Sequence, residues 1–501
     1  MRVLFRVDAS MEIGSGHAAR CRVLADELVA QAQAECHFIG RDPDGIVASQ
    51  LDQTPHVLHI LPEPTDTSIE TSVSPPHAAW LKRSQADDLA ACRSVLGDLW
   101  NGIEWLVVDH YGIDATWERE FPGKVFAIDD LADRDHACDI LFDQNLRVDA
   151  WKDYQDSLEP GVRLLSGPRY ALLRNEFRQA TDHSPGVDLF VSFGGADPGN
   201  DVMKVIAALE GLPGVSSHVA VSGRHPALAE LRARVRDLPG CHLHVDHEDL
   251  AYLMRDARLA IGAGGGMAWE RCACSLPSLA WPIAENQRDQ LSQLERAGAV
   301  ELVAEEVHPD PERLAGTITK LLQDHAELSS MAAAARSLCD GAGASRACKA
   351  MLAAELHLRA PTQDDARMIW KWRNDPEVRS TAFDPAEIPW EDHERWFARS
   401  LENPGRLMRI AEFHGDDAGF IRLDRDNDTA EVSIFLSPAR KGSGLGPALL
   451  ASIEREIPGD WNCRTLRAGI RPENEISISL FENAGYRFQH NEWRKPLKVE
   501  E

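Results

Sequence analysis

The sequence predicts an α/β chain with two doubly wound domains, followed by a smaller α+β domain. Over the first 345 residues, short apolar segments typical of parallel strands alternate with helical segments, and the alternation restarts after a polar bridge at residues 181–186. Beyond that point, extended segments are separated by polar turns, which is typical of an antiparallel sheet. We therefore expect domains at residues 1–184, 185–345 and 354–501.

The expected strands are short in all three domains. Those of the first domain lie at residues 2–7, 36–39, 105–108, 125–128, 140–142 and 162–165. Those of the second begin at residue 188 and continue at 218–221, 242–245, 259–261 and 279–281. Those of the third lie at 356–359, 409–413, 419–423 and 431–436, with a Trp/Arg-rich helix after the first, a helix after Gly446 and another over 474–485.

Composition excludes several classes of protein. The 53 basic and 80 acidic residues give a net charge of −27, which disfavours binding to nucleic acid or to an anionic membrane surface. No apolar run reaches the roughly 20 residues that span a bilayer, so we expect a cytoplasmic protein. The ten cysteines are scattered, and Cys272 with Cys274 lacks a second pair at zinc-ligand spacing, so we expect reduced thiols and no metal site.

A glycine-rich turn near the N-terminus ends in a histidine. The run Ile13-Gly14-Ser15-Gly16-His17 follows the first strand and opens a helix whose backbone N–H groups would face an anionic ligand. The positive end of the helix dipole disfavours protonated His17, so a neutral imidazole could take a proton from water. Alternatively, a histidine in this position is a helix cap or a surface residue.

A second glycine cluster repeats this arrangement in the second domain. Gly262-Ala263-Gly264-Gly265-Gly266-Met267 follows an apolar strand and precedes a helix that carries Glu270. Two such loops in two α/β domains are suited to a nucleotide-sugar that lies across them. Glu270 is placed to accept both ribose hydroxyls, or it only favours the helix N-terminus.

The first 345 residues resemble the UDP-sugar hydrolases of pseudaminic acid biosynthesis, which have the GT-B fold of two Rossmann-like domains. The matching runs lie at residues 6–8, 13–17 with Arg20, 109–112, 128–130, 143–145, 167–174, 192–198, 264–266 with Glu270, and 284–287. The resemblance implies that His17 activates the attacking water and that Tyr111 and Asn286 line the sugar pocket. Alternatively, Tyr111 only packs against other side chains and does not contact the sugar.

Further substrate contacts are expected from both loops and the strand ends beside them. The expected residues are Asp8, Gly14, Ser15, Gly16, Arg20, Gly264, Gly265, Gly266, Met267, Glu270 and Gln287. Asp8, Asp109, Asp129 and Asp130 all follow or end strands, where polar residues also hold loops in place. Their role stays open at this stage.

The last 145 or so residues resemble the GNAT acyltransferases, and among them the acetyltransferase of the same sugar pathway. The matching pieces lie at residues 358–359, 364–365, 372–376, 378–379, His393 and 396–397. The resemblance implies an acetyl-CoA co-substrate whose pyrophosphate lies on a loop that follows a strand, with Asn474 near the pantetheine arm. The cofactor-binding residues so implied are Leu436, Lys441, Gly442, Ser443, Gly444, Leu445, Gly446 and Asn474.

Two departures from the GNAT pattern affect this prediction. Lys441 stands where the family has Arg or Gln, which keeps the charge. Phe481 stands where many members have the tyrosine that protonates the leaving thiolate, so Tyr486 or solvent takes over, or the domain is slow. Glu431 is a candidate base for the acceptor amine, or an ordinary acid at a strand edge.

Together these features predict a bifunctional enzyme of pseudaminic (nonulosonic) acid biosynthesis. It would N-acetylate a UDP-4-amino-4,6-dideoxy sugar and then hydrolyse UDP-2,4-diacetamido-2,4,6-trideoxy-β-L-altrose to UDP and free sugar. Expected partners are UDP-sugars, with no nucleic acid and no membrane; the oligomeric state stays open. The alternatives are a GT-B glycosyltransferase fused to a GNAT domain, and a nucleotide-sugar binding scaffold with a degenerate GNAT domain.

Overall fold

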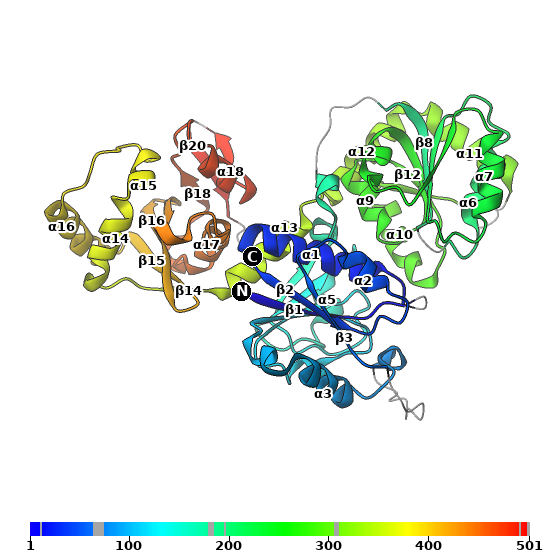
Figure 1. The fold of residues 1–501 in the computed structure, drawn as a ribbon. Helices are drawn as coiled ribbons and strands as arrows, with labels where there is room; N and C mark the ends of the chain where they lie inside the picture. The colour runs from blue at the N-terminus through cyan, green and yellow to red at the C-terminus, as the bar shows by residue number, and fades with distance from the viewer. Residues whose placement is uncertain are drawn as a thin grey trace. The chain divides into compact units, whose positions relative to one another are not determined.

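The computed structural model describes residues 1–10, 13–63, 75–178, 185–194, 197–304, 310–489 and 492–497. Residues 181–184 of the predicted bridge, and Gly195 and Ala196 of the run 192–198, lie outside the described residues. The chain forms two compact units, one of residues 1–26 with 34–347 and one of residues 27–33 with 348–501. The first unit contains two sheets and the second contains one (Figure 1).

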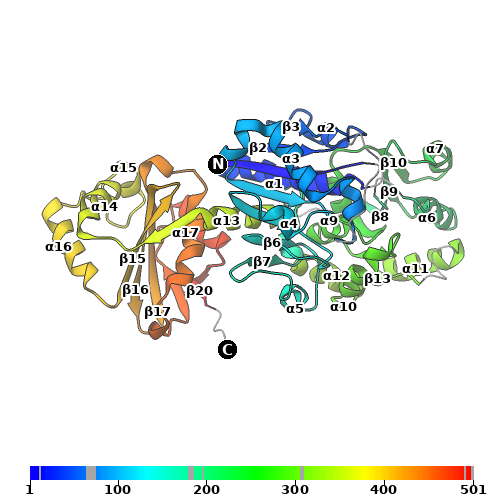
Figure 2. The same cartoon turned by 90° about the horizontal axis from the view of Figure 1, so that it is seen from below.

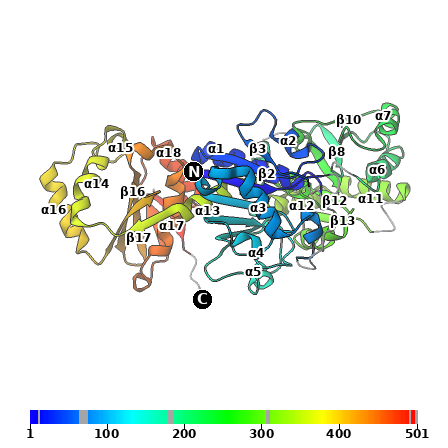
Figure 3. The ribbon, with the colours of Figure 1, turned by 60° about the horizontal axis from the view of Figure 1, so that its bottom comes forward.

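The first sheet is parallel throughout, with the order β3-β2-β1-β4-β5-β6-β7. Its helices α1 and α3 lie on opposite faces (Figures 1 and 3), and Leu89 and Leu96 of α3 pack on Leu4 and Leu106 of the sheet. Since β1 and β4 are neighbours, the residues that follow them meet at one edge. The elements are β1 (Arg2–Val7), α1 (Gly16–Ala32), β2 (Glu35–Gly40), α2 (Ile46–Leu51), β3 (Val57–Ile60), η1 (Ala78–Leu81), α3 (Gln85–Leu96), η2 (Gly97–Gly102), β4 (Trp105–Asp109), α4 (Ala115–Glu118), β5 (Lys124–Ile128), β6 (Ile140–Asp143), α5 (Ala150–Tyr154), β7 (Arg163–Ser166), η3 (Pro168–Tyr170) and η4 (Asn175–Arg178).

The second sheet is also parallel, with the order β10-β9-β8-β11-β12-β13. Helices α6, α7 and α11 cover one face, and α9 and α10 cover the other (Figure 1). Helix α8 also packs on the second face, whereas α12 contributes residues to the buried clusters on both faces. The elements are β8 (Val187–Ser192), α6 (Asp201–Leu209), β9 (Ser217–Val221), α7 (Leu228–Arg236), β10 (Cys241–Val245), α8 (Leu250–Arg255), β11 (Ala257–Gly262), α9 (Met267–Ala273), β12 (Ser278–Ala280), η5 (Glu285–Gln287), α10 (Arg288–Arg296), β13 (Val300–Leu302), α11 (Pro311–Gln323), α12 (His325–Leu338) and α13 (Gly343–Glu355).

The third sheet is mixed, with the order β14-β15-β16-β17-β18-β20-β19. Helices α14 and α16 pack on one face and α17 on the other (Figure 2). The elements are β14 (Leu356–Arg359), η6 (Gln363–Asp365), α14 (Ala366–Arg373), α15 (Pro376–Ser380), α16 (Trp390–Leu401), β15 (Arg406–Phe413), β16 (Asp416–Asp426), β17 (Thr429–Leu436), η7 (Pro438–Arg440), α17 (Leu445–Ile453), η8 (Glu454–Glu456), η9 (Gly459–Trp461), β18 (Thr465–Ala468), α18 (Glu475–Asn483), β19 (Arg487–Gln489) and β20 (Glu492–Pro496).

The fold class predicted from the sequence is therefore confirmed, with some strands missing from the prediction. No helix of the described residues is long and apolar enough to cross a bilayer. The ten cysteines all lie in the described part of the chain, and none of them forms a disulfide bond there.

Candidate functional site

His17 and Asp109 form a hydrogen-bonded pair at the edge where β1 and β4 end. The Nδ1 of His17, in the first turn of α1, lies 2.6 Å from Oδ1 of Asp109, the last residue of β4. Burial alone would raise the pKa of Asp109, but the neighbouring Arg20 and His17 hold it well below its usual range. Since an ionised Asp109 accepts the Nδ1 hydrogen, a neutral His17 presents an unprotonated Nε2.

Arg20 stabilises this pair from one turn further along α1. Its Nε and Nη2 each donate to a different Asp109 oxygen at 2.6 Å, and its Nη1 donates to Asp130 at 2.9 Å. Burial acts to lower the Arg20 pKa, but Asp109 and Asp130 raise it well above its usual value. Because its donors are already used inside the protein, we interpret Arg20 as a positioning residue for the His17–Asp109 pair.

Tyr111 belongs to the same network. Its hydroxyl donates to Asp130, and its ring meets the His17 ring edge-on at 4.8 Å. Only 9% of Tyr111 is exposed, and burial followed by the Asp130 charge raises the pKa of its hydroxyl well above its usual value. Tyr111 therefore keeps its proton and fixes the ring of His17.

Asp8, which the sequence places among the substrate contacts, lies in a separate buried ion cluster. Its Oδ1 accepts from the Arg41 backbone N–H at 2.8 Å and from the Arg6 side chain, and its Oδ2 lies 3.1 Å from His110 Nε2. Asp88 completes the cluster with ion pairs to Arg6 and Arg41. Since protein groups occupy both Asp8 oxygens, we interpret Asp8 as a structural residue, and the prediction that it contacts substrate has no support in this arrangement.

The first glycine turn leaves room beside its backbone. Gly14 has φ of +86°, and a side-chain carbon added at Gly14 or Gly16 would meet no atom within 4 Å. The turn is closed by the Gly14 N–H, which donates to Ser10 O at 2.7 Å, while Ser15 is exposed. The open space lies directly before His17.

The second glycine loop is fixed by Gln287. The Gln287 Oε1 accepts from the backbone N–H groups of Gly264 and Ile283, each at 3.2 Å. A side-chain carbon on Gly264 would come within 2.5 Å of Leu291, whereas one on Gly266 would meet nothing. The loop is thus held on one side and open at Gly266, just before Met267 begins α9. The side chain of Asn286 lies outside the described part of the structure.

Glu270 is the unsatisfied acid of this region. Its Oε2 is buried, and within the described residues it has no hydrogen-bond partner. Burial raises the Glu270 pKa to about 6, although Arg174 and Arg271 act to lower it. A buried carboxylate oxygen without a partner is costly, and ligand hydroxyl groups would supply the missing hydrogen bonds.

In the third sheet, two parallel strands separate beside Glu431. The pairing of β17 with β18 covers only Thr429 to Glu431, although β17 continues to Leu436. The turn after β17 holds Gly442 and Gly444, whose φ values are +73° and +74°, and α17 starts at Leu445. Lys441 lies 2.8 Å from Glu377 and 3.1 Å from Asp375, and Asn474 caps α18 through the Ser477 N–H.

The face of the sheet that carries Glu431 also gathers arginines, which the sequence did not single out as a group. Arg422 is paired across β16 and β17 with Ser433, two residues from Glu431, and so shares its face. Burial lowers the pKa of Arg373, and Arg422 and Arg379 lower it further. Arg373 Nη1 and Arg379 Nε have no hydrogen-bond partner among the described residues.

Tyr486 lies in the core of the third sheet and not at the place where β17 and β18 separate. It is fully buried, its ring meets Phe481 edge-on at 4.8 Å, and its hydroxyl has no partner in the described residues. Burial raises its pKa well above the usual value, and charges at Glu454 and Cys463 add to the rise. A hydroxyl that is buried in the core near Glu454 and Cys463 disfavours the predicted role of Tyr486 as proton donor to a thiolate.

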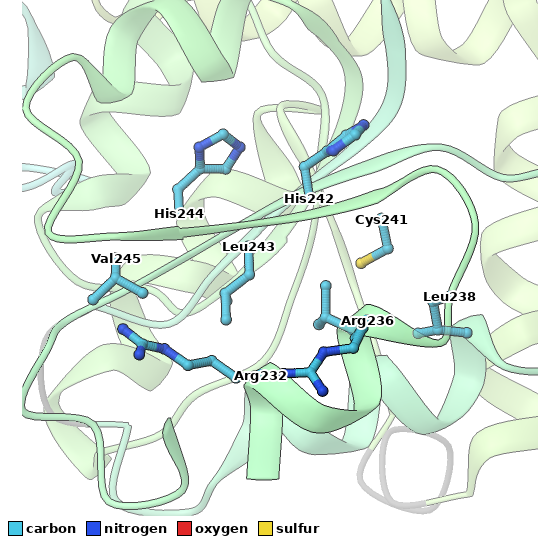
Figure 4. A pocket seen from close by; sticks show the side chains of 9 residues that line it. Arg232, Arg236, Leu238, Cys241, His242, Leu243, His244 and Val245 are labelled. Atoms are coloured by element: carbon cyan, nitrogen blue, oxygen red, sulfur yellow. The ribbon is translucent and has the colours of Figure 1, made fainter. Parts of the chain in front are cut away.

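A groove of about 680 Å³ lies elsewhere, at the edge strand β10, and none of the predicted site residues line it. Cys241 and Leu243 point from β10 towards α7, which carries Arg232 and Arg236, while His242 and His244 point away (Figure 4). Within the described ranges, no group of three or more His, Cys, Asp or Glu residues is placed to hold a metal ion.

Known proteins resemble the two parts of the chain separately. Residues 355–487 match the family model of the acetyltransferase (GNAT) domain. The protein YwnH of Bacillus subtilis (strain 168), which bears an acetyltransferase name, is 33% identical over 115 residues, 22% of this chain and 69% of YwnH.

The N-terminal part matches a curated hydrolase. UDP-2,4-diacetamido-2,4,6-trideoxy-beta-L-altropyranose hydrolase of Campylobacter jejuni is 26% identical over 304 residues, 60% of this chain and 97% of the hydrolase. The solved structure of Phytolacca americana UGT2 covers 67% of this chain and 93% of its own, with 14% identity and a TM-score of 0.51, and so shows the GT-B fold. The chain therefore belongs to the GNAT acetyltransferases through residues 355–487, and its N-terminal GT-B part is a relative of the UDP-diacetamido-trideoxy-altropyranose hydrolases.

Proposed function

We propose that the N-terminal part hydrolyses UDP-2,4-diacetamido-2,4,6-trideoxy-β-L-altropyranose to UDP and free sugar. The observation that carries this proposal is the 2.6 Å contact between His17 and Asp109, in the part of the chain that is 26% identical to the Campylobacter jejuni hydrolase. His17 Nε2 takes a proton from water as the water oxygen attacks the anomeric carbon. The bond between that carbon and the phosphate oxygen breaks, and its electron pair leaves with UDP.

The second glycine loop and Glu270 suit the nucleotide. Backbone N–H groups around Gly265, Gly266 and Met267 would donate hydrogen bonds to the leaving diphosphate and so stabilise its negative charge. The unpaired Glu270 Oε2 would accept the ribose hydroxyls. Asn286 stays a proposed sugar contact on the strength of the resemblance alone.

We also propose that the GNAT domain transfers an acetyl group from acetyl-CoA to the 4-amine of a UDP-4-amino-4,6-dideoxy sugar. The loop Lys441–Gly446 would hold the coenzyme pyrophosphate, while Leu436 and Asn474 would lie along its arm. Glu431 would take the amine proton through water as the nitrogen attacks the thioester carbon and the C–S bond breaks. Solvent would protonate the departing thiolate, because Tyr486 is buried elsewhere.

The arginines near Glu431 support a phosphate-bearing acceptor. Arg422 interacts with Glu431, the proposed base, and Arg373 lies close enough to Arg422 and Arg379 to feel their charge. This positive charge would attract a diphosphate and repel a polyamine. Because this acceptor becomes the substrate of the hydrolase after acetylation, the two activities would act in sequence.

An isotope experiment tests the hydrolase proposal. Full-length protein is incubated with the acetylated UDP-sugar in H₂¹⁸O, and both products are analysed by mass spectrometry. We expect ¹⁸O in the free sugar and none in UDP, because water attacks carbon. Label in UDP, or release of UDP only when a sugar or alcohol acceptor is added, would contradict the proposal; the second result would identify a glycosyltransferase.

A further inference from the structure

An aromatic cluster lies next to His17, and two of its three rings have no role in the proton chemistry described above. It consists of Tyr111, Trp80 and His77, the last two from the segment that contains η1. The Trp80 ring stacks on the Tyr111 ring at 5.5 Å with an interplanar angle of 30°. His77 lies 5.2 Å from Trp80 and 5.6 Å from Tyr111 between ring centroids.

Within the cluster, Tyr111 has little surface left for a ligand. His17 and Trp80 cover its ring, Arg134 lies 5.5 Å from its centroid, and its hydroxyl is bound to Asp130. Trp80 remains partly exposed, and so does His77. The aromatic surface that a ligand beside His17 can touch therefore belongs to Trp80 and His77 more than to Tyr111.

The segment that carries these two rings is anchored at several points. Pro75 is buried, and Leu81 is 1% exposed in the core of the first sheet. A side-chain carbon added at Gly112 would lie 3.0 Å from the His77 carbonyl oxygen, so the turn after Tyr111 fits closely against this segment. The backbone of this segment is thus held by packing at other residues. We therefore expect it to keep its position when the Trp80 side chain is replaced.

We propose that Trp80, with His77 beside it, is the aromatic wall of the sugar subsite. It would select sugars that present apolar groups, namely ring C–H groups, a C6 methyl and acetamido methyls, over sugars with hydroxyl groups there. This inference rests on the proposed hydrolase function. Trp80, which belongs to neither glycine loop, would then recognise the apolar substituents of the sugar.

The test compares Trp80→Ala, Trp80→Phe and Trp151→Ala in the full-length protein. Trp151 is a matched control, because it lies on helix α5 of the same domain and is 59% exposed. For Trp80→Ala we expect KM for the diacetamido UDP-sugar to rise by about 10-fold or more, with the Kd for UDP within twofold of wild type. Trp80→Phe should recover most of the loss, and Trp151→Ala should match wild type.

Two results would overturn the inference. One is a Trp80→Ala enzyme whose KM stays within twofold of wild type. The other is a Kd for UDP that rises as much as KM, which would mean that Trp80 only supports the fold. Saturation-transfer NMR with the free diacetamido sugar gives an independent readout, in which the methyl signals should weaken in Trp80→Ala. If wild type releases no UDP but these signals still depend on Trp80, the proposed hydrolysis fails and the sugar subsite stands.

Discussion

The Nδ1 of His17 lies 2.6 Å from the carboxylate of Asp109, a residue 92 positions further along the chain. The parallel pairing of β1 with β4 brings these positions together, because each side chain comes from the same end of the sheet. The pair gives His17 a defined hydrogen-bond partner on one ring nitrogen and leaves the other for water.

Asp109→Asn should lower UDP-sugar hydrolysis roughly 10²–10⁴-fold, because a neutral amide no longer stabilises the imidazolium or fixes the ring tautomer. Steady-state kinetics on the acetylated UDP-sugar measures the loss. Asp130→Asn is the comparison, since it removes only the indirect support of His17 through Arg20 and Tyr111 and keeps the Asp109 contact, so its loss should be much smaller. Equal losses in the two variants would argue against a special role for Asp109.

Glu270→Gln should change stability and UDP binding in opposite directions above pH 6. Burial raises the Glu270 pKa to about 6, so the ionised side chain destabilises the fold as pH rises through that value. The glutamine variant should gain up to about 2 kcal/mol at pH 8, and nothing below about pH 4.5. Calorimetric unfolding at pH 4.5 and pH 8 measures this difference.

The same Glu270→Gln variant should bind UDP more weakly at pH 8, because an amide oxygen is a poorer acceptor for ribose hydroxyls than a carboxylate. Titration calorimetry with UDP checks the effect. Uridine affinity should fall in parallel, since the contact is to ribose. An unchanged UDP affinity would remove Glu270 from the nucleotide site.

Arg373→Met should raise KM for the UDP-amino-sugar by about 10-fold while KM for acetyl-CoA stays within twofold, because the lost charge faces the acceptor. The acetylation rate is measured from the free thiol of coenzyme A that the reaction releases. Arg395→Met is the control, since Arg395 lies on α16 with a 71% exposed side chain. A proportional rise in KM for acetyl-CoA would show that Arg373 does not act on the acceptor.

Tyr486→Phe should leave the acetylation rate within about twofold of wild type, because its hydroxyl is buried without a partner in the described residues. The substitution removes an unsatisfied polar group, so the melting temperature should stay the same or rise. Loss of 10-fold or more in rate, with an unchanged melting temperature, would restore Tyr486 as the proton donor.

The sequence predicts most strands of the first two sheets, because their apolar runs are long enough to stand out. It misses β3 and β13: the first contains His59 and has no fully buried residue, and the second has three residues. It also misses β18, β19 and β20, which are short and rich in arginine and lysine. β3, β13 and β19 are edge strands, whereas β18 and β20 lie inside the third sheet, and all five lack the apolar signal on which such a prediction depends.

The candidate site was predicted less completely than the fold. His17 and Glu270 stand out because each follows a glycine loop, whereas the role of Asp109 depends on a sheet pairing that no local pattern shows. Asp8 looks like a ligand contact from its place after β1, but Arg6 and Arg41 surround it. Trp80 carries no motif, and only its packing on Tyr111 places it near His17.

His17→Ala tests the central claim most directly, measured as the rate of UDP release from the acetylated UDP-sugar beside the affinity for UDP. If His17 is the general base, the rate should fall about 10²–10⁴-fold while the Kd for UDP stays within twofold of wild type. The unchanged Kd for UDP shows that the N-terminal part is folded, and acetylation by the GNAT domain of the same sample should be unchanged as well. A hydrolysis rate within threefold of wild type would contradict the account.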